Sequence, residues 1–243
     1  MEGFKACEHL AIIMDGNGRW AAREGVDRQQ GHRKGAEVAL DIVKHCVTTT
    51  VKSVTLYCLS TENMKRPKKE VQFLIHLLNQ TLLDNERLFQ DEGIRVKVVG
   101  DLRFMGEDLN ATVSDIQSKT EHHTKLELNI AFNYSGKWQI QQAVEHVCRC
   151  SVASGNSQQF IEFERHIRSD IGSDPDLLIR TSGEYRLSNF MLYHLAYTEL
   201  VFDNTLWPDF NEQILDKHLR DFCLIDRRFG QVKDSNELVP DVT

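Results

Sequence analysis

Six short apolar runs rich in β-branched residues recur along the chain, and longer stretches with helical spacing separate them. The runs are "LAIIMD", "SVTLYCLS", "IRVKVVGD", "LELNIAFN", "LLIRTSG" and "ELVFD", at residues 10–15, 53–60, 94–101, 126–133, 177–183 and 199–203. Strands that alternate with helices in this way form largely parallel sheets covered by helices. A chain of 243 residues suits one such domain better than two. We expect a single α/β domain over residues 1–243, with a largely parallel six-stranded sheet flanked by helices and a flexible tail from about residue 231.

Polar residues cluster where several of these expected strands end. The clusters are "DGNGR" at 15–19, "STEN" at 60–63 and "RTSGE" at 180–184. In open parallel sheets, ligands bind beyond the carboxyl ends of the strands. We therefore expect these clusters to converge on one site.

The first cluster has the chemistry of an anion site with one discordant member. Gly16 and Gly18 let the backbone turn tightly and approach a ligand, and a following helix would direct free N–H groups at a phosphate. Arg19 adds a fork of donors that suits phosphate oxygens. Asp15 would repel a phosphate unless a cation such as Mg²⁺ lies between them. The same letters are equally typical of a strand-to-helix turn with a capping aspartate.

Further arginines lie in or beside the strand-end clusters, at Arg28, Arg66, Arg180 and Arg186. Each charge-assisted hydrogen bond contributes roughly 1.5 to 3 kcal/mol, so several at one site would hold a diphosphate firmly. The formal net charge of the chain is -7, which gives no global basic field of the kind that binds nucleic acid. The anion site must therefore be local.

Two other phosphate-handling classes are tested by the same residues. The chain has no GxxxxGK[ST] loop, which argues against a P-loop nucleotide hydrolase. Asp15 after an apolar strand also fits an aspartate-dependent phosphatase that forms a phosphoryl-aspartate, although those enzymes usually have a second aspartate where this chain has Asn17. The phosphatase stays open as an alternative at this stage.

Residues 71–90, "VQFLIHLLNQTLLDNERLFQ", are more apolar than one stripe against a sheet requires. As one helix they would be about 30 Å long. The segment is either a well-buried helix or the wall of an apolar tunnel between the sheet and the helices. The chain shows no signal peptide and no run of about 18 apolar residues, so we expect a cytoplasmic protein.

Six motifs in the same order resemble the cis-prenyltransferases. They are "HLAIIMDGNGRWA", "GHRKGAE", "LYCLSTENMKRPKKEV", "LNIAFNYSGKW", "LLIRTSGEYRLSNFMLYHLAYTELVF" and "LWPDF", between residue 9 and about residue 230. The resemblance implies an enzyme, usually homodimeric, that adds isopentenyl diphosphate units to farnesyl diphosphate with new cis double bonds. The expected product is undecaprenyl diphosphate, the lipid-carrier precursor for cell-wall polysaccharides. Its growing tail would need an apolar tunnel and a peripheral membrane contact for release.

The resemblance also implies roles for individual residues. Asp15 would coordinate Mg²⁺ with Glu199 as a second metal-linked carboxylate, and Asn63 would assist proton removal near the reacting carbons. The allylic diphosphate would be held by Gly16, Asn17, Gly18, Arg19 and Arg28, with His32 beside it. Isopentenyl diphosphate would be held by Arg180, Arg186 and Ser188. The remaining candidate substrate contacts are Trp20, Ser60, Thr61, Glu62, Met64, Arg66 and Leu187, together with Arg228 and Gly230 of an "RFG" element that would reach the site of a partner subunit.

Some positions depart from the family pattern. Met64 stands where the family commonly has tryptophan, and Ser182 stands where it commonly has glycine. Some family members are non-catalytic accessory subunits that have lost catalytic groups. Asp15, Asn63 and Arg66 are all present here, which argues against an accessory subunit, and this class is kept as the second alternative to a catalytic prenyltransferase.

Overall fold

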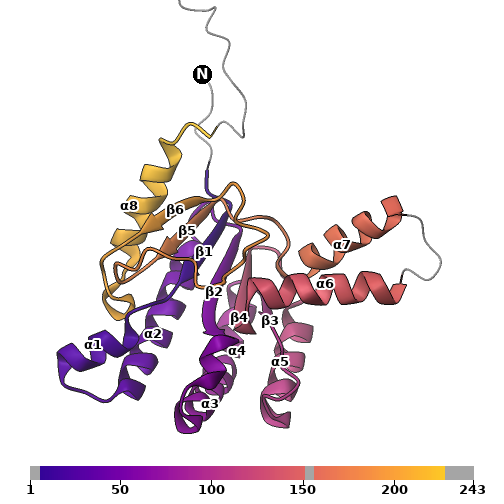
Figure 1. Cartoon of the computed structure of the whole chain (residues 1–243). Coiled ribbons are helices and arrows are strands. Elements are labelled where there is room, and N and C mark those ends of the chain that lie inside the picture. The colour runs from indigo at the N-terminus through magenta and orange to yellow at the C-terminus, as the bar shows by residue number, and fades with distance from the viewer. Residues whose placement is uncertain (1–5, 151–155, 228–243) are drawn as a thin grey trace, which may run out of the picture.

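The computed structural model describes residues 6–150 and 156–227 and contains one six-stranded sheet (Figure 1). Its strands are β1 (His9–Ile13), β2 (Ser53–Ser60), β3 (Ile94–Val99), β4 (Leu126–Tyr134), β5 (Leu177–Arg180) and β6 (Glu199–Phe202). Their order is β3-β4-β2-β1-β5-β6, and each neighbouring pair runs parallel. Each strand overlaps its predicted run, which confirms the α/β fold. The predicted tail from residue 231 lies outside the described residues.

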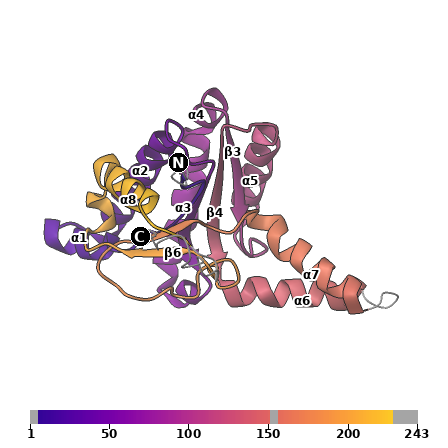
Figure 2. The same cartoon turned by 90° about the horizontal axis from the view of Figure 1, so that it is seen from above.

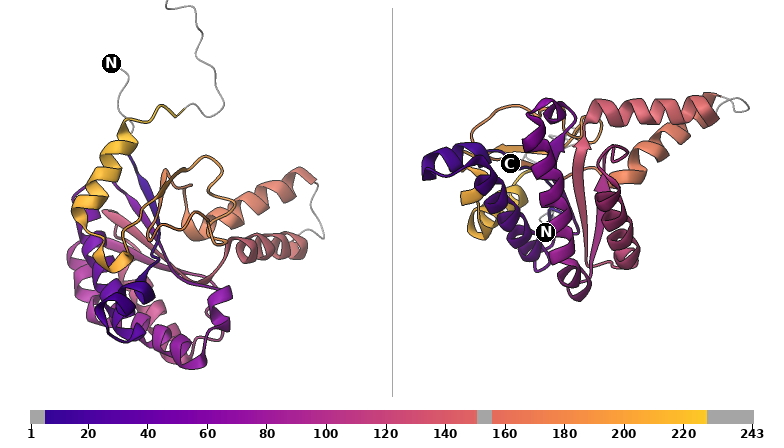
Figure 3. Two further views of the ribbon diagram at one scale, coloured as in Figure 1. Left: turned by 60° about the vertical axis from the view of Figure 1, so that its left-hand side comes forward. Right: turned by 90° about the horizontal axis from the view of Figure 1, so that it is seen from below.

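One face of the sheet is covered by helices that lie side by side (Figures 1 and 3). These are α2 (Arg28–Cys46), α3 (Lys68–Asp84) and α5 (Glu107–Thr120), with α8 (Glu212–Cys223) beside α2 (Figure 2). Leu10 and Ile12 of β1 point into this layer, where they belong to one core with Ile42, Leu74 and Leu215. Because successive strand residues alternate between faces, the opposite face must be covered by other elements.

The opposite face packs against an irregular segment, residues 181–198, and against two further helices. Ala11 and Ile13 of β1 and Tyr57 of β2 share a second core there with Phe190 and Met191. The Tyr57 and Phe190 rings stack with their centroids 4.3 Å apart. The helices are α6 (Gly136–Cys150) and α7 (Asn156–Ile171), which extend beyond the sheet (Figure 1). The sheet is thus buried on both faces, as parallel sheets require.

The predicted single helix over residues 71–90 is wrong in one respect, because it is broken. α3 ends at Asp84, and a short helix α4 (Glu86–Asp91) follows. At the break, Asn85 has φ −114° and ψ 11°, and its Nδ2 donates to the carbonyl of Thr81 at 2.8 Å. An asparagine side chain that bonds to a nearby carbonyl competes with helix continuation. α3 buries Val71, Leu74, Leu78 and Leu82, a stripe at helical spacing.

β1 lies at the centre of the sheet and determines where the site forms. Ile13 is level with Tyr57 of β2 on one side and with Arg180 of β5 on the other. The chain continues from β1 to β2 on one side and returns later to β5 on the other, so loops diverge beyond these strand ends. Ligand sites of open α/β sheets form at such a divergence.

His9 lies near the amino end of β1 and is 1% exposed. Its Nδ1 lies 2.7 Å from the Ser173 carbonyl and its Nε2 lies 2.8 Å from Thr55 Oγ1. Because a carbonyl only accepts, Nδ1 must donate, and the neutral ring then accepts from the threonine hydroxyl. Burial lowers the pKa of His9 from 6.5 to about 4.

The pKa of His9 predicts loss of stability in mild acid. Between pH 6.5 and 4 the unfolded chain binds a proton that folded His9 excludes, so the free energy of unfolding falls as the pH drops through this window. The decrease from this one group should reach about 3 kcal/mol. Urea denaturation at several pH values should show a smaller decrease in His9→Gln, whereas exposed His122→Gln should match the wild type. An unchanged pH dependence in His9→Gln would contradict the assignment.

Candidate active site

Asp15 follows β1 on a turn that its neighbours fix through the backbone. Its N–H donates to Thr181 Oγ1 at 3.0 Å, and the threonine hydroxyl donates to the Asp15 carbonyl at 2.7 Å. Gly16 has φ 116°, and a Cβ there would lie 3.0 Å from Leu206 Cα, so this turn requires glycine. Helix α1 (Asn17–Glu24) begins at the next residue, and no side chain caps its first turn. Its first N–H groups can therefore meet an anion.

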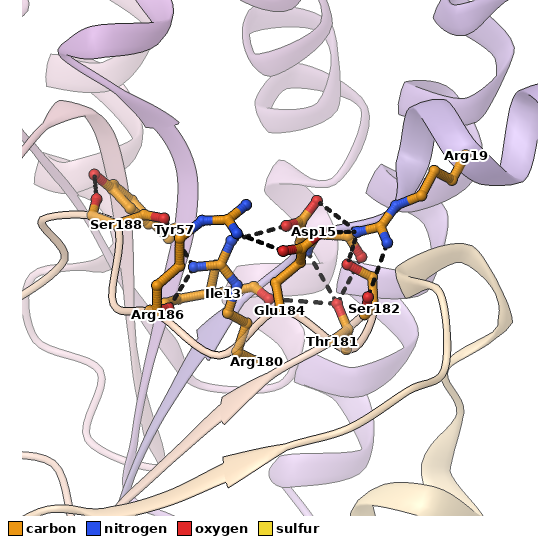
Figure 4. A network of polar contacts seen from close by, with 10 residues as sticks. All are labelled: Ile13, Asp15, Arg19, Tyr57, Arg180, Thr181, Ser182, Glu184, Arg186 and Ser188. Carbon is orange, nitrogen blue, oxygen red and sulfur yellow. Dashed lines mark hydrogen bonds and ion pairs between the residues drawn. The ribbon is translucent and has the colours of Figure 1, made fainter.

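The Asp15 carboxylate is paired with Arg180, a buried arginine at the end of β5 (Figure 4). Arg180 Nη2 donates to Asp15 Oδ2 at 2.9 Å, and Arg180 Nη1 donates to Ser188 Oγ at 2.8 Å and to the Arg186 carbonyl. The Arg180 side chain is 3% exposed, whereas that of Asp15 is 33% exposed. One side of the carboxylate is therefore fixed by the protein, and the other stays accessible to a ligand.

Arg19 lies on the far side of Asp15 and connects it to the segment after β5 (Figure 4). Its Nη2 lies 3.7 Å from Asp15 Oδ1 and 3.4 Å from Glu184 Oε1, and its Nη1 donates to the Ser182 carbonyl at 2.9 Å. Ser182 has φ 75°, a left-handed conformation that glycine adopts without strain. The Ser182 hydroxyl also accepts from Arg19, which offsets part of that strain. Arg186 in turn pairs with Glu184.

A second charged cluster centres on Glu70, in the first turn of α3. Its Oε1 lies 3.0 Å from Arg28 Nε, 3.1 Å from Arg66 Nη1 and 3.5 Å from His32 Nε2. Burial lowers the pKa of His32 below its usual range, so its ring is neutral at pH 7, and its buried Nε2 has no hydrogen-bond partner among the described residues. Sequence reasoning missed Glu70, because an acidic residue after Arg-Pro is equally typical of an ordinary helix start.

Members of both clusters line a polar pocket of about 280 Å³, whereas Arg19, Glu184 and Glu70 do not line it. The predicted site residues that line it are Asp15, Gly16, Asn17, Gly18, Arg28, His32, Ser60, Asn63, Arg66, Arg180, Arg186 and Ser188. Beside it, between α2, α3 and the sheet, lies a mostly apolar pocket of about 110 Å³. Met14, Asn17, His32 and Cys58 line both pockets, so the two adjoin. The arrangement can hold an anionic group with an apolar chain attached to it.

Several predicted contacts do not line the polar pocket. Trp20 Nε1 donates to Asp209 Oδ1 at 3.0 Å, so its ring is anchored beside α1. Met64 packs against the core under α2 and α3, and Leu187 packs against the core on the other face. Thr61 and Glu62 bond to each other, with 3.2 Å between Thr61 Oγ1 and Glu62 Oε2. Arg228 and Gly230 lie outside the described residues.

The structure does not bring Glu199 beside Asp15. Glu199 begins β6 and is level with Leu177 of β5 and Leu10 of β1, so it lies where the parallel strands have their amino ends. Asp15 lies past the opposite end of β1: the strand covers about 10 Å from Leu10 to Ile13, and Asp15 follows two residues beyond it. Mg²⁺ needs ligands at about 2.1 Å, so these carboxylates cannot share one ion within a chain. Within residues 6–150 and 156–227, no group of three or more His, Cys, Asp or Glu side chains could hold a metal.

The fold and site together define an α/β protein whose basic polar pocket adjoins an apolar one at the carboxyl ends of the strands. Residues 13–230 match a family model described as "Putative undecaprenyl diphosphate synthase". The chain is 40% identical to an isoprenyl transferase of Aquifex aeolicus over 95% of its length and 98% of the relative. It is 41% identical to a (2E,6E)-farnesyl-diphosphate-specific ditrans,polycis-undecaprenyl-diphosphate synthase of Coxiella burnetii, over 94% and 98% of the two chains.

A solved structure agrees with these sequence comparisons. Lavandulyl diphosphate synthase from Lavandula x intermedia, in complex with dimethylallyl diphosphate, superposes with a TM-score of 0.87 at 31% identity. The match covers 93% of this chain and 99% of that one. The chain therefore belongs to the undecaprenyl diphosphate synthase family of cis-prenyltransferases.

Replacement of Arg180 by lysine tests the central ion pair. A lysine keeps the charge but cannot bond to Asp15 and Ser188 together, so Arg180→Lys should weaken binding of inorganic diphosphate about 30-fold. Isothermal calorimetry measures this directly. Arg87→Lys, at a side chain that is 92% exposed, is the matched control and should bind like the wild type. Equal affinity in the two variants would show that Arg180 does not organise the anion site.

Proposed function

We propose that this chain elongates farnesyl diphosphate by repeated addition of isopentenyl diphosphate, with new cis double bonds, to give undecaprenyl diphosphate. The observation that carries the proposal is the junction of the two pockets at Met14, Asn17, His32 and Cys58. A diphosphate head in the polar pocket would place its hydrocarbon chain in the apolar one. The product would serve as the lipid-carrier precursor for cell-wall polysaccharides.

The residues around Asp15 fit a magnesium ion. Mg²⁺ is commonly bound by one or two carboxylates together with substrate phosphates and water, and Asp15 presents a partly exposed carboxylate at the pocket. When bound, the ion supplies positive charge to the diphosphate that leaves the allylic carbon. Arg180 keeps the carboxylate oriented in the absence of substrate. Glu199 contributes no ligand to this ion within the same chain.

The arginines on the two sides of the pocket suit two diphosphates. Arg28, His32 and the first turn of α1 would hold the allylic diphosphate, where negative charge grows as its bond to carbon breaks. Arg180, Arg186 and Ser188 would hold isopentenyl diphosphate. Donors fixed before the reaction need no reorganisation as that charge develops.

A proton must leave isopentenyl diphosphate after the new bond forms. Asn63 lies in the pocket, and its N–H donates to Ser60 Oγ at 3.1 Å. A neutral amide is a poor base, so a diphosphate oxygen would be the proton acceptor. Asn63 would instead help to position the reacting carbons. Thr61, Met64, Trp20 and Leu187 would then support the site through packing and turn geometry.

Elongation requires the apolar pocket to widen. Its volume of about 110 Å³ is below the roughly 150 Å³ of an engineered cavity that accommodates benzene, so it holds little more than one five-carbon unit. Each buried CH₂ contributes about 0.8 kcal/mol, which would drive a growing chain between α2, α3 and the sheet. We propose that these helices separate to form the tunnel.

Thr81 offers a test of the tunnel. It lines the apolar pocket from α3 and is only partly buried, so a larger side chain there fills the pocket without disrupting the core. Thr81→Phe should shorten the product distribution, whereas Thr81→Val keeps the shape and should preserve it. Chromatographic sizing of the labelled polyprenols measures both. Unchanged lengths in Thr81→Phe would place the growing chain elsewhere.

The exposed apolar side chains of α6 and α7 support a homodimer. Val144, Phe160 and Ile161 are 48%, 65% and 57% exposed, and apolar patches of this kind commonly mark interfaces. Arg227, the last described residue, bonds to Asp176 at 2.6 Å, near the amino edge of the sheet. The "RFG" element at 228–230 thus follows a residue held far from its own pocket, which supports a role of Arg228 and Gly230 in the site of a partner subunit.

The product suggests where the enzyme acts. Within residues 6–150 and 156–227, no helix combines the length and apolar character needed to cross a bilayer. We propose a cytoplasmic enzyme that touches the inner face of the membrane peripherally, where lipid would receive the emerging polyprenyl tail.

An elongation assay tests the proposed function. Farnesyl diphosphate, labelled isopentenyl diphosphate, Mg²⁺ and detergent should yield a ladder that ends at one polyprenyl length. Asp15→Asn removes the charge but keeps the shape, and should lower incorporation at least about 100-fold. Asp41→Asn, at a side chain that is 63% exposed, is the matched control.

The same assay separates the two alternatives. No incorporation by the wild type alone, with activity restored by a partner chain, would identify an accessory subunit. Covalent phosphate on Asp15 without elongation would identify a phosphatase.

A further inference from the structure

Asn189, in the segment 181–198, bonds to two other segments of the chain. Its Nδ2 donates to Glu62 Oε1 at 2.7 Å, and its Oδ1 accepts from the N–H of Lys137 at 3.0 Å. Its carbonyl accepts from the N–H of Gly136 at 2.6 Å. The 3₁₀ turn after β2 (Glu62–Lys65), the start of α6 and residues 181–198 are thus joined through one side chain and its backbone.

Two of the segments joined by Asn189 contribute residues to the lining of the pocket. Asn63 follows Glu62 directly, while Arg186 and Ser188 lie just before Asn189, and all three line the pocket. The Asn189 side chain itself does not line it. Its bonds therefore influence the separation of these two segments without contacting the ligand.

The backbone conformation explains why an asparagine occurs here. Asn189 has φ 63°, and Ser188 and Met191 nearby have φ 48° and 42°. A left-handed residue costs about 1–2 kcal/mol unless it is glycine or an asparagine with local hydrogen bonds. The three bonds of Asn189 offset that cost, and the stacking of Phe190 on Tyr57 holds the adjacent residue. The strain lies beside the pocket, where it fixes the conformation.

We propose that Asn189 is a positioning residue that holds the Glu62–Asn63 turn at a fixed distance from Arg186 and Ser188. This inference rests on the proposed function, since a fixed separation matters when two bound diphosphates must react. Partial burial of Glu62 raises the pKa of its carboxyl group, but hydrogen bonds led by that from Asn189 outweigh this effect and lower it. Glu62 is thus the ionised acceptor of the link.

Asn189→Gly tests the link, because glycine keeps the left-handed backbone and removes both side-chain bonds. Displacement of reacting groups by about 1 Å can cost up to about 100-fold in rate, so kcat should fall about 30-fold while both KM values change less than about threefold. Amide hydrogen exchange in residues 61–66, measured without substrate, should rise about tenfold. Normal exchange in this segment, or a loss confined to one KM, would overturn the inference.

Asn133→Gly is the matched control. Asn133 also has a left-handed backbone, with φ 48°, and its Nδ2 donates to the Asp101 carbonyl at 2.7 Å, away from the polar pocket. This variant should lose stability but keep the wild-type kcat, KM values and exchange in residues 61–66. A response equal to that of Asn189→Gly would attribute both effects to general destabilisation and overturn the inference.

Reversing the donor and the acceptor of the hydrogen bond between residues 189 and 62 gives a second test, which does not depend on activity. Asn189→Asp places a carboxylate against Glu62 and should increase exchange in residues 61–66 further than glycine does. Adding Glu62→Gln restores a donor opposite an acceptor and should return that exchange toward the wild-type rate. If the double variant exchanges as fast as Asn189→Asp alone, the inference is wrong. If the variants show the expected exchange rates but the wild type lacks elongation activity, the proposed function is wrong, while the structural role of Asn189 stands.

Discussion

The ion pair between Arg180 and Asp15 organises the end of the sheet. Arg180 is nearly fully buried, so its charge must be satisfied by fixed acceptors, which are Asp15, Ser188 and the Arg186 carbonyl. These bonds join the residue after β1 to the segment after β5, and Thr181 joins the same two strands through the backbone of Asp15. A buried arginine thus converts two neighbouring strand ends into one rigid wall of the pocket. Arg19 and Glu184 extend that wall outward.

Another part of the pocket lining depends on close contact between α1 and α2. A Cβ on Gly31 would lie 2.3 Å from the Asn17 carbonyl, and a Cβ on Gly35 would lie 2.4 Å from Asn17 Oδ1. Only glycine at both positions lets α2 approach the first residue of α1 this closely. The approach brings His32 and Arg28 of α2 to the pocket lined by Asn17, and Glu70 of α3 then meets both side chains. Two glycines in a helix, unfavourable by about 1 kcal/mol each, are therefore explained by the site.

The sequence predicts the sheet well because period and residue type are local properties. The alternation of apolar runs with helical stretches predicts all six strands, and the residues Asp15, Ser60 and Arg180 of the strand-end clusters line one polar pocket. Glu70 could not be found in this way, since its role depends on α3 packing beside α2. Glu199 lies near the amino ends of the strands whereas Asp15 lies past their carboxyl ends, a separation that only the strand register reveals. The break at Asn85 depends on one hydrogen bond that periodicity does not register.

The charged groups around the pocket are largely paired with one another, which constrains how an anion binds. Arg28 uses its Nε on Glu70 and Arg66 uses its Nη1, so each guanidinium retains further N–H groups out of its five. Glu70 therefore fixes these arginines without consuming all of their donors. Its negative charge also reduces the repulsion among Arg28, Arg66 and neighbouring cations in a partly buried site. A diphosphate would bind to donors whose orientation is already fixed. Its binding would therefore not include the entropic cost of ordering the Arg28 and Arg66 side chains.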